Sequence, residues 1–225
     1  MNNSDIYIIG DIHGYWDTIF SRINLIDLKD CTLIGVGDLG IGFVNSAKQE
    51  RQFKYLNDFF SSRNINFIGI RGNHDDPSYF NGDVTYSHFT LLADYTTMTL
   101  NDKEFMFVGG AVSVDRIRRK DGVSYWKDEI FILDQSKIKR CDVLITHSAP
   151  TWNGPFDKVG IETYLSADET LWKECVEERK AHDILIKLCG AKKHYCGHFH
   201  KYYLTENEGC VSRILEEHEI ILSTI

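Results

Sequence analysis

Short apolar runs that lead into metal-ligating residue types are the feature that most limits how this chain can fold. Three such runs, at 6–9, 32–36 and 65–70, are each followed within two residues by glycine and then by Asp or Asn. Two later runs, at 143–145 and 193–196, lead into Thr-His and Gly-His. Runs of this length beside glycine predict buried strands. Because ligands gather outside the carboxyl ends of strands in α/β sheets, we predict that five strand ends meet at one site.

The side chains at these strand ends form a donor set for metal ions. The set contains Asp, His and Asn but no Cys, and its members are Asp11, His13, Asp38, Asn73, His147, His198 and His200. Such donors suit manganese, iron or zinc, whereas a structural zinc site uses closely spaced Cys and His ligands. One ion cannot use so many donors. The sequence therefore favours two divalent ions that share a carboxylate, a centre suited to in-line displacement at phosphorus.

In these motifs and in their order, the chain resembles the calcineurin-like metallophosphoesterase superfamily, with its small bacterial and phage-type members. The matching motifs are Gly10–Gly14, Gly37-Asp38, Gly72–Asp75, His147 and Gly197–His200. They extend over nearly the whole chain, and the ordered set is specific although each motif alone is common. The resemblance implies an α/β fold, namely a four-layer α/β/β/α sandwich with two mixed β-sheets.

The resemblance also implies a role for each matching residue. One ion would take Asp11, His13, Asp38 and His200. A second ion, to which Asp38 bridges, would take Asn73, His147 and His198. His74 matches the family's catalytic histidine, which protonates the leaving oxygen or stabilises its charge.

These roles imply a metal-dependent phosphoric ester hydrolase. The expected reaction is attack of a metal-bridging hydroxide on a phosphomonoester or a small nucleotide-like substrate. A phosphodiesterase or nuclease with the same chemistry is one alternative. A metal-binding scaffold without catalysis is another, and the complete ligand set together with His74 argues against it.

One motif departs from the pattern of protein serine/threonine phosphatases, which read Gly-Asp-x-Val-Asp-Arg-Gly. Ile41 and Gly42 stand where those enzymes have the Asp that orients the catalytic histidine and the Arg that binds phosphate. This difference disfavours a protein phosphatase. Arg116 or Arg119 is a candidate substitute, as a bidentate ligand of the substrate phosphate. The alternative for both is a solvated basic loop.

Composition restricts the partners and the location of the chain. Its net charge of −8 disfavours an extended nucleic-acid surface, so the expected partner is a small phosphorylated substrate. The N-terminus shows no basic, apolar leader, and no apolar run approaches the ~18 residues that a membrane span needs. We therefore expect a cytoplasmic protein without membrane contact. The 6 Cys form no Cys-x-x-Cys pair, as expected of reduced thiols, and the sequence gives no oligomeric state.

The remaining pattern predicts one mixed α/β domain over residues 1–225, because no linker or repeat divides the chain. Helices are expected at 15–27, 46–62, 132–139 and 166–188. The last of these is expected to begin with a capping box of Ser166 and Glu169. Further strands are expected at 87–92, 96–100 and 104–108, and a closing antiparallel meander at 202–205, 211–215 and 219–223.

Several residues around these motifs have two interpretations. Asp75 and Asp76 are expected either to hydrogen-bond a ligating group or to cap the turn at Pro77. The segment 152–160 is interpreted as a packing lid or as a loop that selects the substrate. Four histidines match no motif and are interpreted as structural or exposed: His88, His182, His194 and His218.

Overall fold

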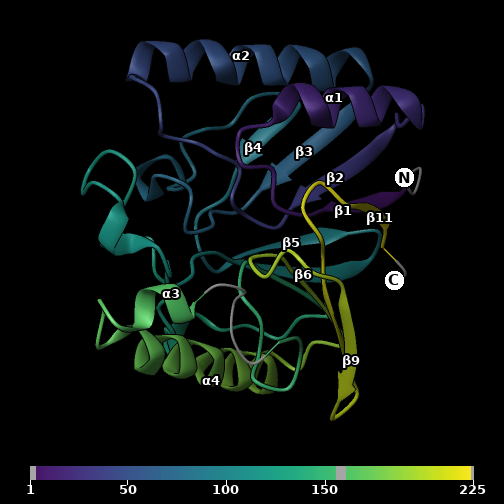
Figure 1. Cartoon of the computed structure of the whole chain (residues 1–225). Helices are drawn as coiled ribbons and strands as arrows, with labels where there is room; N and C mark the ends of the chain where they lie inside the picture. The colour runs from purple at the N-terminus through teal and green to yellow at the C-terminus, as the bar shows by residue number, and fades with distance from the viewer. Residues whose placement is uncertain (1–3, 156–160, 224–225) are drawn as a thin grey trace.

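The computed structural model describes residues 4–155 and 161–223 of the chain. Two mixed β-sheets lie face to face in the middle of the molecule, and helices cover the outer face of each sheet (Figure 1). The predicted four-layer α/β/β/α sandwich is thus confirmed. The part of the segment 152–160 that follows Pro155 lies outside the described residues.

The first sheet contains the three strands that lead into the early motifs. Its order is β11-β1-β2-β3-β4, with β1 Ile6–Ile9, β2 Cys31–Gly35, β3 Ile65–Gly69, β4 Phe89–Leu91 and β11 Ile220–Leu222. The pairs β1·β2, β2·β3 and β3·β4 are parallel, and β11 is antiparallel to β1. The carboxyl ends of β1, β2 and β3 therefore open on the same edge of the sheet.

Two helices, α1 (Trp16–Leu25) and α2 (Ser46–Ser62), cover this sheet on its outer face. Trp16, Ile19, Phe20 and Ile23 are buried along one side of α1, at the spacing of an amphipathic helix. At the start of α2, the side chain of Asn45 accepts a hydrogen bond from the backbone N–H of Lys48. Both helices are crossover connections between parallel strands, as the sequence predicts.

The second sheet delivers the two later motifs. Its order is β5-β6-β7-β8-β10-β9, with β5 Thr96–Leu100, β6 Lys103–Val108, β7 Val143–Thr146, β8 Lys193–Cys196, β9 Tyr203–Asn207 and β10 Cys210–Ile214. The strands β6, β7, β8 and β10 are parallel, and β5 and β9 close the edges as antiparallel strands. Helices α3 (Glu162–Leu165) and α4 (Leu171–Cys189) lie on the outer side (Figure 1).

The core between the sheets consists of aliphatic and aromatic side chains from both of them. Ile8, Ile34 and Ile68 point inward from the first sheet. They pack with Phe105, Phe107, Val143 and Ile145 of the second. The first sheet is covered on both faces, which explains why its strands β1 and β2 are apolar runs without alternation. This packing holds the two sets of strand ends next to each other.

The predicted closing meander is correct for its first two strands, since β9 and β10 pair antiparallel, but wrong for its last strand. The strand β10 pairs in parallel with β8, whereas β9 pairs with β10 at the outer edge. The last strand, β11, joins the other sheet, where it covers the edge of β1. Local pattern identifies a strand but not its partner, and pairing with β1 satisfies backbone groups that an open edge would expose.

Two helix predictions also need correction. The expected helix at 132–139 is only a 3₁₀ turn, Gln135–Lys137, because the Asp134 side chain accepts from the backbone N–H and the hydroxyl of Ser136. The long helix begins at Leu171, and Ser166 instead ends the short α3. The capping box with Glu169 is therefore absent. Contacts with Arg116 hold Asp168, Thr170 and Glu174 at the start of α4. Tertiary contacts have thus overridden the local signal.

Two more 3₁₀ turns lie in connections within a sheet: Pro77–Tyr79 between β3 and β4, and Arg116–Arg118 between β6 and β7. In the described ranges, none of the helices has the length and apolar character that crossing a bilayer requires.

Candidate metal centre

The carboxyl ends of five strands meet at one site, as the sequence predicts. Asp11 and His13 follow β1, Asp38 follows β2, and Asn73 follows β3 in the first sheet. The second sheet contributes His147 after β7, and His198 and His200 after β8. All seven side chains belong to loops immediately after strands. Their positions are therefore set by the packing of the two sheets.

The loops hold these residues in backbone conformations that are rare outside glycine. His13, Asp38, His198 and His200 have φ angles of 50°, 50°, 67° and 56°. Left-handed conformations of this kind cost energy and are common at functional sites. Gly72 shows how closely the loops pack, because a Cβ atom there would lie 2.1 Å from Asp38 Oδ1. The backbone is constrained so that the side chains converge.

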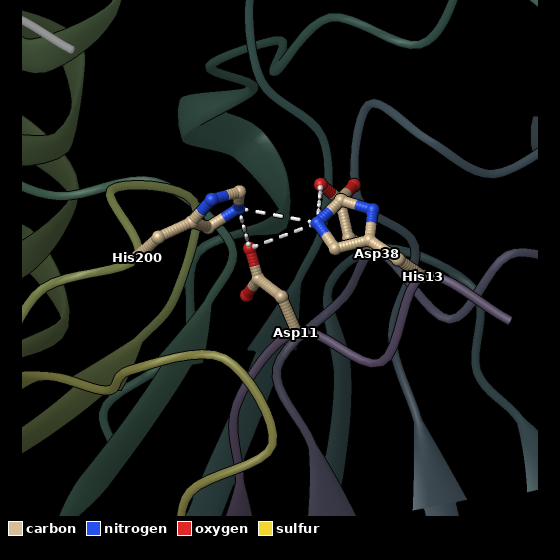
Figure 2. A group of neighbouring side chains, drawn as sticks. All are labelled: Asp11, His13, Asp38 and His200. Carbon is tan, nitrogen blue, oxygen red and sulfur yellow. Dashed lines mark hydrogen bonds and ion pairs between the residues drawn. The ribbon is translucent and has the colours of Figure 1, made fainter. Parts of the chain in front are cut away.

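Three donors, Asp11, His13 and His200, form what we call the open group (Figure 2). His200 Nε2 lies 3.0 Å from Asp11 Oδ2 and 3.1 Å from His13 Nε2. Asp11 is buried, and its carboxylate accepts two hydrogen bonds from the backbone N–H of His198. The side chains of His13 and His200 are 18% and 30% exposed, so solvent reaches this side.

The other donors, Asn73, His147 and His198, form what we call the buried group. Asn73 Oδ1 lies 2.8 Å from His198 Nδ1 and 3.1 Å from His147 Nε2. All three residues are at most 4% exposed. His147 Nδ1 lies 2.8 Å from the carbonyl oxygen of Val36. A hydrogen bond from Nδ1–H to that oxygen directs Nε2 into the centre, as is usual for a histidine that binds a metal.

Asp38 lies between the open group and the buried group. Its Oδ1 accepts from the backbone N–H of His74 at 2.7 Å and lies 3.2 Å from His147 Nε2. Its Oδ2 lies 3.6 Å from His13 Nε2, and it is buried without a hydrogen-bond partner among the described residues. A buried carboxylate oxygen of this kind is costly. The donor set and this oxygen both fit the binding of divalent metal.

The charges of the centre shift the pKa values of its members. Burial favours the neutral form of Asp38, but the neighbouring His147 and His74 lower its pKa well below the usual range. Burial likewise opposes the charged form of Asp11, and the hydrogen bond from His200 lowers its pKa. The pKa of His147 is raised to about 9 by Asp38, although burial acts in the other direction. The site thus concentrates negative charge that a cation would balance.

Asp75 is buried beneath the centre, and its hydrogen bonds connect two of the loops that form the centre. Its carboxylate accepts hydrogen bonds from the backbone N–H groups of Leu39, Ile41 and Gly72, at 2.8 to 3.0 Å. Burial, then the nearby charge of Asp38, raises the pKa of Asp75 to about 7. Asp75 thus bonds to backbone instead of to a ligating side chain. Asp76 accepts from the backbone N–H of Ser78 and caps the turn, as one of the two interpretations expects.

A buried polar network supports Asn73 and has little signal in the sequence. Asn73 Nδ2 donates to Ser113 Oγ at 2.9 Å, and Ser113 Oγ donates to Glu129. Glu129 is fully buried and accepts from the backbone N–H of Trp126. These bonds hold the amide so that Oδ1 faces His147 and His198. Ser113 follows the end of β6, which is the one local hint, whereas Glu129 has none.

The two arginine candidates have partners within the protein. Arg119 lies 3.4 Å from Glu129 and donates to the carbonyl oxygen of Asn73 at 3.0 Å. Arg116 pairs with Asp168 at 2.6 Å and with Glu174. Arg119 is therefore next to the buried group, and Arg116 is at the start of α4. That either one binds phosphate stays a prediction.

His74 and Glu217 flank the open group on different sides. The His74 and His13 rings meet edge to face with centroids 5.1 Å apart, and both line a cavity of about 330 Å³. Glu217 Oε1 lies 3.3 Å from His200 Nδ1 and 3.7 Å from His13 Nε2. The sequence reasoning missed Glu217. Its only signal is an acidic segment between β10 and β11.

Comparisons with solved structures find similar chains at low identity. The chain is similar to GAP50, the anchor in the inner membrane complex of Plasmodium, with 13% identity and a TM-score of 0.45 over 95% of this chain and 71% of that chain. It is also similar to the phosphopantetheinyl hydrolase PptH of Mycobacterium tuberculosis, with 12% identity and a TM-score of 0.47 over 96% and 90%. A comparison with curated protein sequences gives no match.

The family model for calcineurin-like phosphoesterases matches residues 4–202, which include every donor of both groups. The family consists of metal-dependent phosphoester hydrolases, and the strand-end donors are the residues by which the chain resembles it. The chain therefore belongs to the calcineurin-like phosphoesterase family.

Proposed function

We propose that the chain hydrolyses a phosphomonoester or a small nucleotide-like phosphate at a centre of two divalent ions, Mn, Fe or Zn. One observation carries this proposal, namely the position of Asp38 between two sets of donors. Its two oxygens face different groups, and the buried Oδ2 has no hydrogen-bond donor among the described residues. A carboxylate in this position is suited to bridging two cations.

The residues divide between the two ions by their positions. Asp11, His13 and His200 would hold one ion, and Asn73, His147 and His198 would hold the other. When bound, the ions would supply Lewis acidity and a nucleophile that is active at neutral pH. Asp38 would hold both, and the constrained loops would keep the donors from rearranging during the reaction.

His74 is the proposed proton donor to the leaving oxygen. It lies beside the open group, edge to face with His13, and it borders the cavity that is large enough for a substrate group. A histidine can exchange a proton near neutral pH, so a protonated His74 can neutralise the leaving alkoxide. Asn73, His147 and His198 are buried, so water has no access to the centre from their side.

Activity assays with controlled metals test this proposal. The protein is stripped with a chelator, reloaded with Mn²⁺, Fe²⁺ or Zn²⁺, and assayed with p-nitrophenyl phosphate and bis-p-nitrophenyl phosphate. We expect hydrolysis of the monoester and two bound ions per chain by elemental analysis. Faster cleavage of the diester would instead support a phosphodiesterase.

The substitution Asp38→Asn tests the shared ligand directly. It should lower kcat/KM by at least about 10²-fold and lower the metal content, because an amide oxygen bridges two cations poorly. Asp102→Asn is a matched control, since Asp102 also has a positive φ, 60°, and lies in the β5–β6 turn. Unchanged activity and metal content in Asp38→Asn would contradict a shared carboxylate.

A further inference from the structure

The cavity beside His74 lies where the leaving group of a substrate would be. It is lined by His13 and His74 of the site, by Phe43, Val44 and Gln52, and by two glycines. Its volume of about 330 Å³ lies within the range of small-molecule sites. If His74 donates a proton to the leaving oxygen, the group attached to that oxygen must extend past His74. This cavity borders His74 on that path.

Among the residues that the structure describes, the lining of this cavity includes no permanently charged side chain. Its polar side chains are the two imidazoles and the amide of Gln52. The two candidate arginines are paired with carboxylates, Arg119 with Glu129 and Arg116 with Asp168 and Glu174. Arg71, two residues before Asn73, pairs with Asp94. A second phosphate or carboxylate in the cavity would meet no Lys or Arg among the described lining residues, and a charge without such a partner is unfavourable.

The far wall of the cavity is apolar and partly aromatic. The side chains of Phe43 and Val44 are 42% and 43% exposed, so their surfaces are available to a ligand. The ring of Trp126 meets Phe43 edge to face, with the centroids 5.3 Å apart. This contact restrains the Phe43 ring. A restrained aromatic ring suits stacking against a planar ring of the ligand.

The backbone that leads into Phe43 is held by hydrogen bonds at the two preceding residues. Asp75 accepts from the backbone N–H of Ile41, and the buried Gln49 accepts from that of Gly42. Gln49 Nε2 also donates to Gln52 Oε1 at 2.8 Å. This bond occupies the carbonyl end of the Gln52 amide. Its nitrogen end is the hydrogen-bond donor that remains for a polar edge of a ligand.

We propose that this cavity binds the leaving group of the substrate, and that this group is an uncharged planar aromatic such as a nucleobase. The inference rests on the proposed function and narrows it. A single phosphate would lie at the centre, and the ring would stack on Phe43. An acceptor atom on the ring would accept a hydrogen bond from the amide N–H of Gln52. Phe43 is thereby a specificity-determining residue. The proposal disfavours bisphosphates and acidic phosphopeptides.

A pair of substrates with the same ester bond tests the aromatic part. Adenosine 5′-monophosphate and ribose 5-phosphate both release a primary ribose alcohol, but only the first has a base. Phe43→Ala should raise KM about tenfold for adenosine 5′-monophosphate and leave ribose 5-phosphate unchanged. Phe43→Tyr should keep the wild-type KM. Equal changes for both substrates, or no change for either, would overturn the inference.

Two further measurements separate this inference from the proposed function. Adenosine 3′,5′-bisphosphate should show a KM about tenfold above that of the 5′-monophosphate, and an equal or lower KM would overturn the charge argument. Adenosine, which has no phosphate, should bind the wild type by ligand-observed NMR and lose binding in Phe43→Ala. If no phosphate ester is hydrolysed with any of the three ions, the proposed function fails. If Phe43→Ala binds adenosine as the wild type does, the proposed subsite is overturned even when hydrolysis occurs.

Discussion

The open group and the buried group share Asp38, but they differ in what holds their side chains in place. His13 and His200 of the open group reach solvent, and the contact beyond them is to Glu217, whose side chain is 48% exposed. Asn73, His147 and His198 are almost fully buried. Behind them lie the Ser113–Glu129 network and the carbonyl oxygen of Val36. Buried, hydrogen-bonded ligands are preorganised, whereas exposed ones must be ordered when a metal binds.

This difference indicates that one centre can contain side chains that are rigidly held and side chains that can adjust. We expect the ion at the buried group to bind more tightly and to exchange more slowly than the ion at the open group. The open group is next to His74 and the cavity, so the more exposed side is also the side that would meet the proposed substrate. Four predictions test the comparison, beginning with the largest expected effect.

Asn73→Ala should have the largest effect because it removes a ligand and leaves Ser113, His147 and His198 without their common partner. We expect kcat/KM to fall by about 10²- to 10³-fold. Metal content after dialysis should drop to one ion per chain, retained at the open group. Asn66→Ala is the matched control, since Asn66 lies exposed on β3, the strand that leads to Asn73. Retention of both ions in Asn73→Ala would remove the asymmetry that we infer.

A pair of Glu→Gln substitutions sharpens the comparison at the supporting residues. Glu129→Gln should lower the affinity of the tighter ion by about 10- to 100-fold, because it weakens the bonds that orient Asn73. Glu217→Gln should lower only the affinity of the weaker ion, and by less, because its carboxylate is half exposed. Chelator competition measures both affinities. If Glu217→Gln lowers metal affinity more than Glu129→Gln does, the ligands of the open group are the more rigidly held ones.

Acid should weaken the strands that carry the buried group through His194. This residue is buried on β8 between the hydroxyls of Thr146 and Ser212, and burial lowers its pKa to about 3. The unfolded chain takes up a proton below pH ~6.5, so the free energy of unfolding falls as the pH drops from there toward 3.

The loss due to His194 should be on the order of 1.4 kcal/mol per pH unit within that window. His194→Gln should lack this part of the pH dependence. Urea unfolding of both proteins at pH 7 and pH 5 measures the difference. A parallel pH dependence of the two proteins would contradict a neutral, buried His194.

The smallest effect should come from Arg116→Gln. Arg116 ties Asp168 and Glu174 at the start of α4, so its loss should cost about 1 kcal/mol of stability or less. KM should stay unchanged if these carboxylates are its only partners during turnover. A clear rise in KM without loss of stability would instead support Arg116 as the phosphate ligand.

The strands and their terminal donors were predictable because both signals are local. An apolar run followed by Gly-Asp or Gly-His identifies the strand, its end and the donor together, as at Asp11, Asp38 and His198. The network of Ser113 and Glu129 was not predictable, because 16 residues separate them and only the fold brings them together. The same reason explains β11, whose partner lies in the other sheet.

Asp75 links the two loops that carry Asp38 and His74, and through Ile41 it also holds the segment with Phe43. One buried carboxyl group thus connects the loops of the proposed catalytic site to the cavity wall that would determine substrate specificity. Substitutions at Phe43 or Val44 could change substrate specificity while the hydrogen bonds of Asp75 stay intact. A change at Asp75 would disturb reaction and selectivity together, so divergence within this lineage should proceed through the outward-facing side chains.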